Sequence, residues 1–60
     1  MVKIYKPEEV KVENIKADRY MRWSYPVTEI EYLLEDGTAD GYVLLDDGRL
    51  WEVFEDDIRG

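Results

Sequence analysis

The chain has 60 residues, 38% of them charged, and a formal net charge of −7 at pH 7. A chain this short forms one small domain, so we expect a single domain over residues 1–60. Because histidine and cysteine are absent, disulfide bonds are excluded and the usual ligands of a structural zinc ion are missing. The acidic charge disfavours direct binding to nucleic acid or to an anionic membrane, since phosphate binding needs clustered Lys and Arg.

The first segment, residues 2–5, is predicted to form a short strand that ends before Pro7. Residues 10–12 and 19–25 follow the alternation that is typical of strands. We expect a bend between them at residues 14–18, because asparagine and aspartate are poor in a helix interior. Two glutamates after Pro7 favour one helical turn there as the alternative, because proline suits the first helical position and acidic residues suit the first turn.

The second half of the chain is predicted to be an antiparallel meander of three strands. Residues 27–34 alternate between apolar side chains and acidic ones (Glu29 and Glu31), which indicates a half-buried strand. Residues 42–45 and 50–54 form the next two strands, and the Asp-Gly pair between them is a strong hairpin signal. The remaining segments connect or follow these strands: 35–41 as a loop with two glycines, 46–48 as a tight turn, and 55–60 as an acidic tail anchored by Ile58.

These elements together predict an all-β domain. We expect a small antiparallel meander in a strongly bent sheet, or a partly open SH3-like barrel, of five to six short strands. The last hairpin is apolar on both faces, with Leu50 and Phe54 on one and Trp51 and Val53 on the other. Closure into a barrel, a dimer or a partner is therefore expected to cover the second face. The SH3-like likeness is one of fold alone and implies no function.

No segment resembles a targeting signal or a membrane span. Residues 1–6 lack the apolar stretch of a signal peptide. The longest apolar run, residues 42–45, has four residues, whereas a transmembrane helix needs about 20. The absence of cysteine is compatible with a reducing compartment. We therefore expect a soluble, cytoplasmic protein.

The residue types argue against catalysis. Histidine, the commonest general base, is missing, and Ser24, the only serine, has no histidine to activate it. The acidic segments 35–40 and 55–57 offer the oxygen ligands that Ca²⁺ prefers, but neither has the ligand spacing of an EF-hand loop. We therefore predict that the protein is not an enzyme, with no catalytic residue, no cofactor-binding residue and no metal ligand.

The acidic residues are concentrated in the second half of the chain. Residues 1–26 carry six basic and four acidic residues, 6 − 4 = +2, whereas residues 27–60 carry two basic and eleven acidic ones, 2 − 11 = −9. Such an asymmetry points to an interaction surface. Residues i and i+2 of a strand lie about 6.5–7 Å apart, close to the spacing of phosphates in a nucleic-acid strand. A row of carboxylates at this spacing could imitate a phosphate backbone.

This pattern predicts a small acidic inhibitor or modulator of another protein. It would bind a basic surface, such as the groove of a host protein that handles nucleic acid. Small acidic proteins of phages and mobile elements resemble it in size and charge. The predicted contacts are seven carboxylates and one aromatic anchor: Glu29, Glu31, Asp46, Asp47, Glu55, Asp56, Asp57 and Trp51. The plain alternative is an acidic face that serves only solubility.

Two further functions remain open. In the first, an SH3-like interaction module binds a peptide or a sister subunit through Tyr20, Trp23 and Tyr25, since tryptophan and tyrosine are enriched in interfaces. Arg19 and Arg22 beside them also suggest base stacking on single-stranded nucleic acid, which the net charge opposes. In the second, the chain is a homodimeric structural protein with no other partner.

Overall fold

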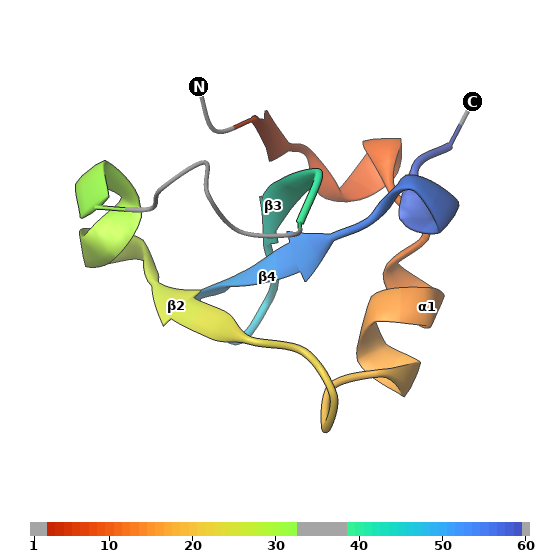
Figure 1. Ribbon diagram of the computed structural model, residues 1–60, viewed down its shortest axis with the longest axis horizontal. Coiled ribbons are helices and arrows are strands. Elements are labelled where there is room, and N and C mark those ends of the chain that lie inside the picture. The colour runs from red at the N-terminus through yellow and green to blue at the C-terminus, as the bar shows by residue number, and fades with distance from the viewer. Residues whose placement is uncertain (1–2, 33–38, 60) are drawn as a thin grey trace.

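The computed structural model describes residues 3–32 and 39–59, without the side chains of residues 30–32. Their central feature is a four-stranded mixed sheet with the strand order β1-β3-β4-β2 (Figure 1). β1 (Ile4–Tyr5) is parallel to β3 (Gly41–Leu44), whereas β4 (Arg49–Val53) is antiparallel to both β3 and β2 (Ser24–Pro26). The helical elements are the α-helix α1 (Val12–Ala17) and the 3-10 helices η1 (Pro7–Glu9), η2 (Val27–Tyr32) and η3 (Glu55–Asp57).

The fold is small and mostly β, but it is neither the predicted SH3-like barrel nor an antiparallel meander of five to six strands. β1 pairs with β3 in parallel, which a meander does not contain. Figure 1 shows α1 and η3 together beyond one end of the sheet and η2 beyond the other. Among the described residues, no helix is long and apolar enough to cross a membrane.

α1 occupies a segment where we predicted the end of a strand and a bend. Val12 and Ile15 are one helical turn apart, so both contribute to the core, and Ile15 is fully buried. The polar residues that argued against a helix lie close to the ends of this short one. Asn14 is in its first turn, and the N–H of Asp18 ends it by donating to the carbonyls of Asn14 and Ile15. The helical turn at Pro7, our alternative, is confirmed as η1.

Two strand predictions were wrong in extent or type. Residues 27–32, predicted as a strand, form η2, and residues 33–38 of that segment and its loop lie outside the described residues. The strand predicted at residues 19–25 is reduced to β2. The sheet topology gives the reason. β3 pairs with β1 and β4, and β4 pairs with β3 and β2, so residues 27–32 find no free edge on either strand.

The predicted hairpin is confirmed as β3 and β4, joined by a turn at residues 45–48. The Gly48 N–H donates to the Leu45 carbonyl at 3.0 Å. Gly48 has a φ of 78°, a left-handed conformation that glycine adopts at little cost. Gly41, predicted in the loop, instead begins β3. A Cβ at this position would lie 2.6 Å from Cε2 of Tyr5, so glycine allows β1 to approach β3.

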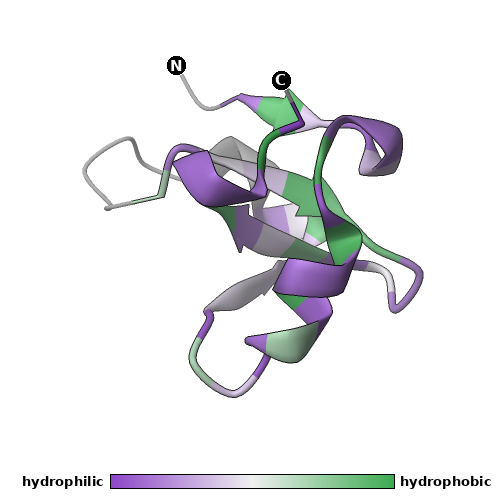
Figure 2. Cartoon of the chain, turned by 90° about the vertical axis from the view of Figure 1, so that its right-hand side faces the viewer, coloured by the Kyte–Doolittle hydropathy of each residue, from purple (hydrophilic) through white to green (hydrophobic). Residues whose placement is uncertain are grey.

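Both faces of the hairpin are covered within the chain, without a closed barrel. The main core lies on the face toward α1 and gathers six buried residues: Val10, Ile15, Val43, Leu45, Trp51 and Val53. On the opposite face, Tyr42 and Leu50 are buried, and the ring of Tyr25 meets that of Tyr42 edge to face with centroids 5.7 Å apart. Figure 2 shows the hydrophobic segments gathered around the sheet, with hydrophilic ribbon around them.

The predicted acidic tail folds back onto the N-terminal segment. Ile58 forms an antiparallel bridge with Val10 and packs against the main core, which confirms the anchoring role predicted for it. Beside the bridge, the Lys11 N–H donates to the Asp57 carbonyl at 2.6 Å. η3 is therefore held next to α1, and this position brings Asp57 to the site described below.

Candidate functional site

The loop between α1 and β2 reverses the usual distribution of side chains. Its residues 18–23, here called the aromatic loop, expose Tyr20 to 100%, Met21 to 86% and Trp23 to 72%. Arg22, which lies among them, has only 7% of its side chain exposed. Buried charges and exposed apolar groups are the informative exceptions to normal burial. In Figure 1 the loop is the lowest part of the molecule and projects away from the sheet.

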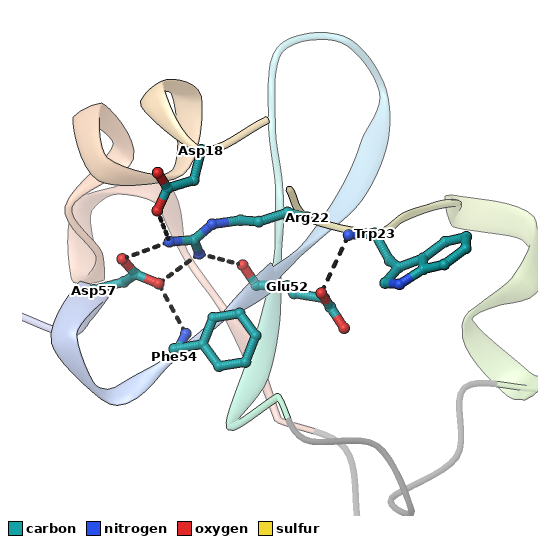
Figure 3. A network of polar contacts seen from close by, with 6 residues as sticks. All are labelled: Asp18, Arg22, Trp23, Glu52, Phe54 and Asp57. Carbon is teal, nitrogen blue, oxygen red and sulfur yellow. Dashed lines mark hydrogen bonds and ion pairs between the residues drawn. The ribbon is translucent and has the colours of Figure 1, made fainter. Parts of the chain in front are cut away.

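Arg22 is held by acceptors from three parts of the fold (Figure 3). Its Nη1 donates to Asp57 Oδ2 at 2.6 Å and to the Glu52 carbonyl at 2.9 Å. Its Nη2 donates to Asp57 Oδ1 and to Asp18 Oδ2, both at 3.1 Å. The guanidinium also lies 5.2 Å from the centre of the Phe54 ring. Because the contact with Asp57 is bidentate, it fixes both the position and the orientation of Arg22.

Glu52 connects the end of the aromatic loop to β4. The Trp23 N–H donates to Oε1 of Glu52 at 3.1 Å, and the Glu52 N–H donates to the Trp23 carbonyl at 3.4 Å. The Glu52 carbonyl, which a regular antiparallel ladder would pair with Trp23, accepts from Arg22 instead. Regular pairing therefore stops at Ser24, and the chain before it leaves the sheet.

The Arg22–Asp57 pair is stabilised in its charged form. Burial raises the pKa of Asp57, but the hydrogen bonds from Arg22 and from the Phe54 N–H outweigh this effect, so the pKa lies below its ordinary value. The hydrogen bond to Asp57 raises the pKa of Arg22. Asp57 is 2% exposed. Removing one partner would leave an uncompensated buried charge, so the pair holds the loop firmly at neutral pH.

Arg19, the other arginine of the loop, is 34% exposed and contacts the β3–β4 hairpin. Its guanidinium lies 5.1 Å from the centre of the Trp51 ring and within 3.8 Å of the carboxylates of Asp46 and Asp47. Asp47 also accepts from Nε1 of Trp51 at 2.9 Å and from the Arg49 N–H at 3.0 Å. Burial raises the pKa of Asp47, but these hydrogen bonds and the charge of Arg19 lower it below its ordinary value.

A pocket of about 430 Å³ adjoins the aromatic loop, between α1 and η3. Three carboxylates and one guanidinium line it (Asp18, Asp56, Asp57 and Arg22), which gives 1 − 3 = −2. Asp18 and Asp56 are exposed. Within the described part of the chain, Asp56 has no ion pair. The pocket beside the loop therefore carries net negative charge.

The eight residues predicted as partner contacts do not share one environment. Five of them are exposed carboxylates: Glu29, Asp46, Asp47, Glu55 and Asp56. The carboxylate of Asp47 is nevertheless engaged by Trp51 and Arg49, and its side chain is 29% exposed. The side chain of Glu31 lies outside the described residues.

The structure corrects the expectation that Trp51 and Asp57 are displayed at the surface. Trp51 is 8% exposed and belongs to the main core, so its ring is not a surface anchor. Asp57 is buried against Arg22. Alternation along a strand assigns a side chain to a face, but it does not say whether a helix covers that face. Here α1 lies over the face of β4 that carries Trp51.

The charge asymmetry of the sequence is partly balanced by ion pairs inside the fold. Basic residues of the first half pair with acidic residues of the second: Lys16 with Asp46, Arg19 with Asp46 and Asp47, and Arg22 with Asp57. In one further pair the halves are exchanged: Arg59 of the second half pairs with Glu13 of the first. The predicted row of free carboxylates is therefore interrupted at Asp46, Asp47 and Asp57.

The outer edge of β2 is poorly suited to pairing with a strand from another chain. Pro26 has no N–H to donate. Arg49 reaches across to Ser24, donating from Nε to Oγ at 2.8 Å and from Nη2 to the carbonyl at 3.0 Å. A proline on an edge strand opposes such pairing, and Arg49 of β4 already occupies the Ser24 carbonyl. A partner that contacts β2 is therefore expected to do so through side chains and not by strand pairing.

The aromatic residues predicted as an alternative surface are divided by the fold. Tyr20 and Trp23 are both exposed on the aromatic loop, whereas Tyr25 packs against Tyr42. Met21 was missed, because strand alternation gave no reason to separate it from a core residue. Its exposure depends on Arg22 being buried, and the order of residues in the loop carries no signal for that reversal.

Within residues 3–32 and 39–59, no three histidine, cysteine, aspartate or glutamate residues are grouped so as to hold a metal ion. No protein-family model, curated protein or solved structure matches the chain.

Proposed function

We propose that this chain is a small acidic modulator that binds another protein through Tyr20, Met21 and Trp23. The observation that carries this proposal is the aromatic loop, which exposes three large apolar side chains while the Arg22–Asp57 pair holds its backbone. Tryptophan and tyrosine are among the residues that most often dominate interface energetics. A loop already fixed in the free protein loses less conformational freedom on association.

The area of the loop suits a central anchor rather than a whole interface. An aromatic side chain buries about 150–250 Å², so the three side chains together offer on the order of 400–500 Å². One partner of a standard interface contributes about 800 Å². Burial of the loop corresponds to roughly 10 kcal/mol, which is similar to the association cost of about 4–15 kcal/mol. Tight binding therefore needs additional contacts around the loop.

Single-stranded nucleic acid fits this surface less well than a protein does. Base stacking on aromatic residues normally uses a basic groove beside them. The cations of the loop are Arg19 and Arg22, and carboxylates of the chain engage both. The loop therefore lacks free positive charge for a phosphate backbone.

The test is an affinity capture from one lysate with three tagged baits: the wild-type chain, a Tyr20→Ser/Trp23→Ser variant, and Val27→Thr as a matched control. Val27 is an exposed apolar residue of η2. We expect mass spectrometry to identify a partner that wild type and Val27→Thr retain and the loop variant loses. A partner retained equally by all three baits would contradict a role for the aromatic loop.

A second candidate is inhibition by charge, in which carboxylates imitate phosphates and block a basic site on a nucleic-acid-handling protein. The net charge of −7 favours it, as do three exposed residues without an ion pair to any described residue: Glu29, Glu55 and Asp56. In this case high salt should release the partner. A Glu55→Gln/Asp56→Asn bait should then lose the partner, while the loop variant keeps it.

A further inference from the structure

Near the aromatic loop one arginine, Arg22, is buried, whereas two carboxylates, Asp18 and Asp56, are exposed. The side chain of Asp18 is 58% exposed at the start of the loop. Asp56 is exposed in the same pocket. Arg22, by contrast, is buried between Asp57 and Asp18. An approaching molecule therefore meets exposed apolar side chains on the loop and exposed carboxylates in the pocket beside it, because the positive charges of the loop already have partners.

From this pattern we infer that the partner's contact face is an apolar cleft with a basic rim. Trp23 and Tyr20 enter the cleft, and an arginine or lysine of the rim lies over Asp18 and Asp56. The inference rests on the proposed function, since it specifies the partner of the same loop. Complementary charge contributes to specificity and to the association rate, while the apolar side chains supply the anchor.

Two other occupants match the surface less well. A second copy of the chain would bring the same exposed carboxylates and the same net charge of −7, and like charges facing each other oppose association. Anionic lipid repels these carboxylates for the same reason, although tryptophan and tyrosine suit membrane interfaces. Charge complementarity therefore selects a basic protein surface.

A random-peptide display library, with the full 60-residue chain as bait, tests this inference. We expect the enriched peptides to combine aromatic or aliphatic residues with Lys or Arg. Synthetic copies should bind an Asp18→Asn/Asp56→Asn variant about 2- to 30-fold more weakly at low salt, the range for two exposed ion pairs. High salt should remove this difference.

Matched variants distinguish the contribution of Asp18 and Asp56 to binding from effects of net charge and of folding. Glu8→Gln/Asp40→Asn removes the same charge at two exposed sites outside the loop and its pocket and should change affinity less than about 2-fold. Since Asp18 contacts Arg22, the single Asp56→Asn variant repeats the test at a residue without an ion pair among the described residues. It should weaken binding in the same direction.

The outcomes distinguish failure of the inference from failure of the proposed function. The basic rim alone is overturned if the peptides need Trp23 but lack basic residues. It is also overturned if they bind the Asn variants as tightly as wild type. Peptides indifferent to Tyr20→Ser/Trp23→Ser, or no enrichment over an unrelated acidic bait, overturn both. Self-association in sedimentation, or binding to phosphatidylserine vesicles, that Trp23→Ser abolishes would replace the inferred partner with a second copy or a membrane.

Discussion

Two connections in this fold are built in opposite ways. The turn at residues 45–48 has a glycine at φ 78°, and its backbone hydrogen bonds join residues no more than four positions apart. The aromatic loop has an arginine inside and apolar residues outside. Its hydrogen bonds from Arg22 reach Glu52 and Asp57, which are 30 and 35 residues further along the chain.

The difference shows that the conformation of a connection can depend on its own residues or on residues far away in the sequence. A turn with local contacts is recognisable from its Asp-Gly pair, because the conformation depends on those residues. The aromatic loop takes its conformation from a carboxylate on η3, so no residue within the loop identifies it. Changes at that remote carboxylate are therefore expected to affect the loop more than changes to its exposed side chains.

Asp57→Asn should have the largest effect. It leaves the buried guanidinium of Arg22 beside a neutral amide, and breaking a buried pair costs about 3–5 kcal/mol. A 60-residue chain has a total stability of about 3–9 kcal/mol, so much of it should be lost. Urea unfolding followed by tryptophan fluorescence measures the loss, and hydrogen exchange shows whether residues 18–23 open first.

The double variant Arg22→Met/Asp57→Asn is the control for this prediction. It removes both charges, so it should be more stable than Asp57→Asn alone by about 1 kcal/mol or more. Equal stability of the single and double variants would mean that the loop does not depend on the ion pair.

Acid should weaken both connections, because each contains a carboxylate with a lowered pKa: Asp57 behind the aromatic loop and Asp47 in the turn. In the unfolded chain such groups take up protons near pH 4. Below that pH the unfolded state therefore binds more protons than the folded state, and stability falls as the pH falls through the lowered pKa values. The stabilisation is fully present at neutral pH.

Urea unfolding at a series of pH values from neutral to about pH 2 measures this loss. Asp57→Asn and Asp47→Asn should each show a smaller loss on acidification than wild type, since each lacks one of the groups. The same acid dependence in all three proteins would rule out these carboxylates as its source.

Gly48→Ala should cost about 1–2 kcal/mol, the usual penalty for an L-residue in the left-handed region. No atom lies within 4 Å of the added Cβ, so the cost is conformational and not steric. Gly48→Asn should cost less, because asparagine tolerates this conformation. Thermal unfolding compares the two variants, and an alanine penalty no larger than that of asparagine would contradict the turn geometry.

Trp23→Ser should have the smallest effect on stability, within about 0.5 kcal/mol, because its side chain is largely exposed in the free protein. The matched change Trp51→Ala removes a core residue and should cost about 3–5 kcal/mol. Substitution of Trp23 thus tests binding, and substitution of Trp51 tests folding. A large stability loss on Trp23→Ser would indicate that the loop serves the fold.

The parts of the fold that could be predicted have local causes. The apolar runs of β3 and β4 and the Asp-Gly pair between them follow from neighbouring residues. The anchoring role of Ile58 followed from its place as an apolar residue within an acidic segment. α1 and η2 could not be assigned in this way, because short segments with mixed preferences adopt the structure that the rest of the sheet leaves open to them.

The sequence by itself determined a small, strongly acidic, mostly β chain with a terminal hairpin, because charge is additive and turn conformations depend on adjacent residues. Only the tertiary structure decided that Arg22 is buried while Tyr20, Met21 and Trp23 are exposed. It also decided that Trp51 lies in the core and that the charges of the two halves pair with each other. The physical reason is that burial of a side chain depends on what packs against it, and the buried partners of Arg22, Glu52 and Asp57, lie 30 and 35 residues away.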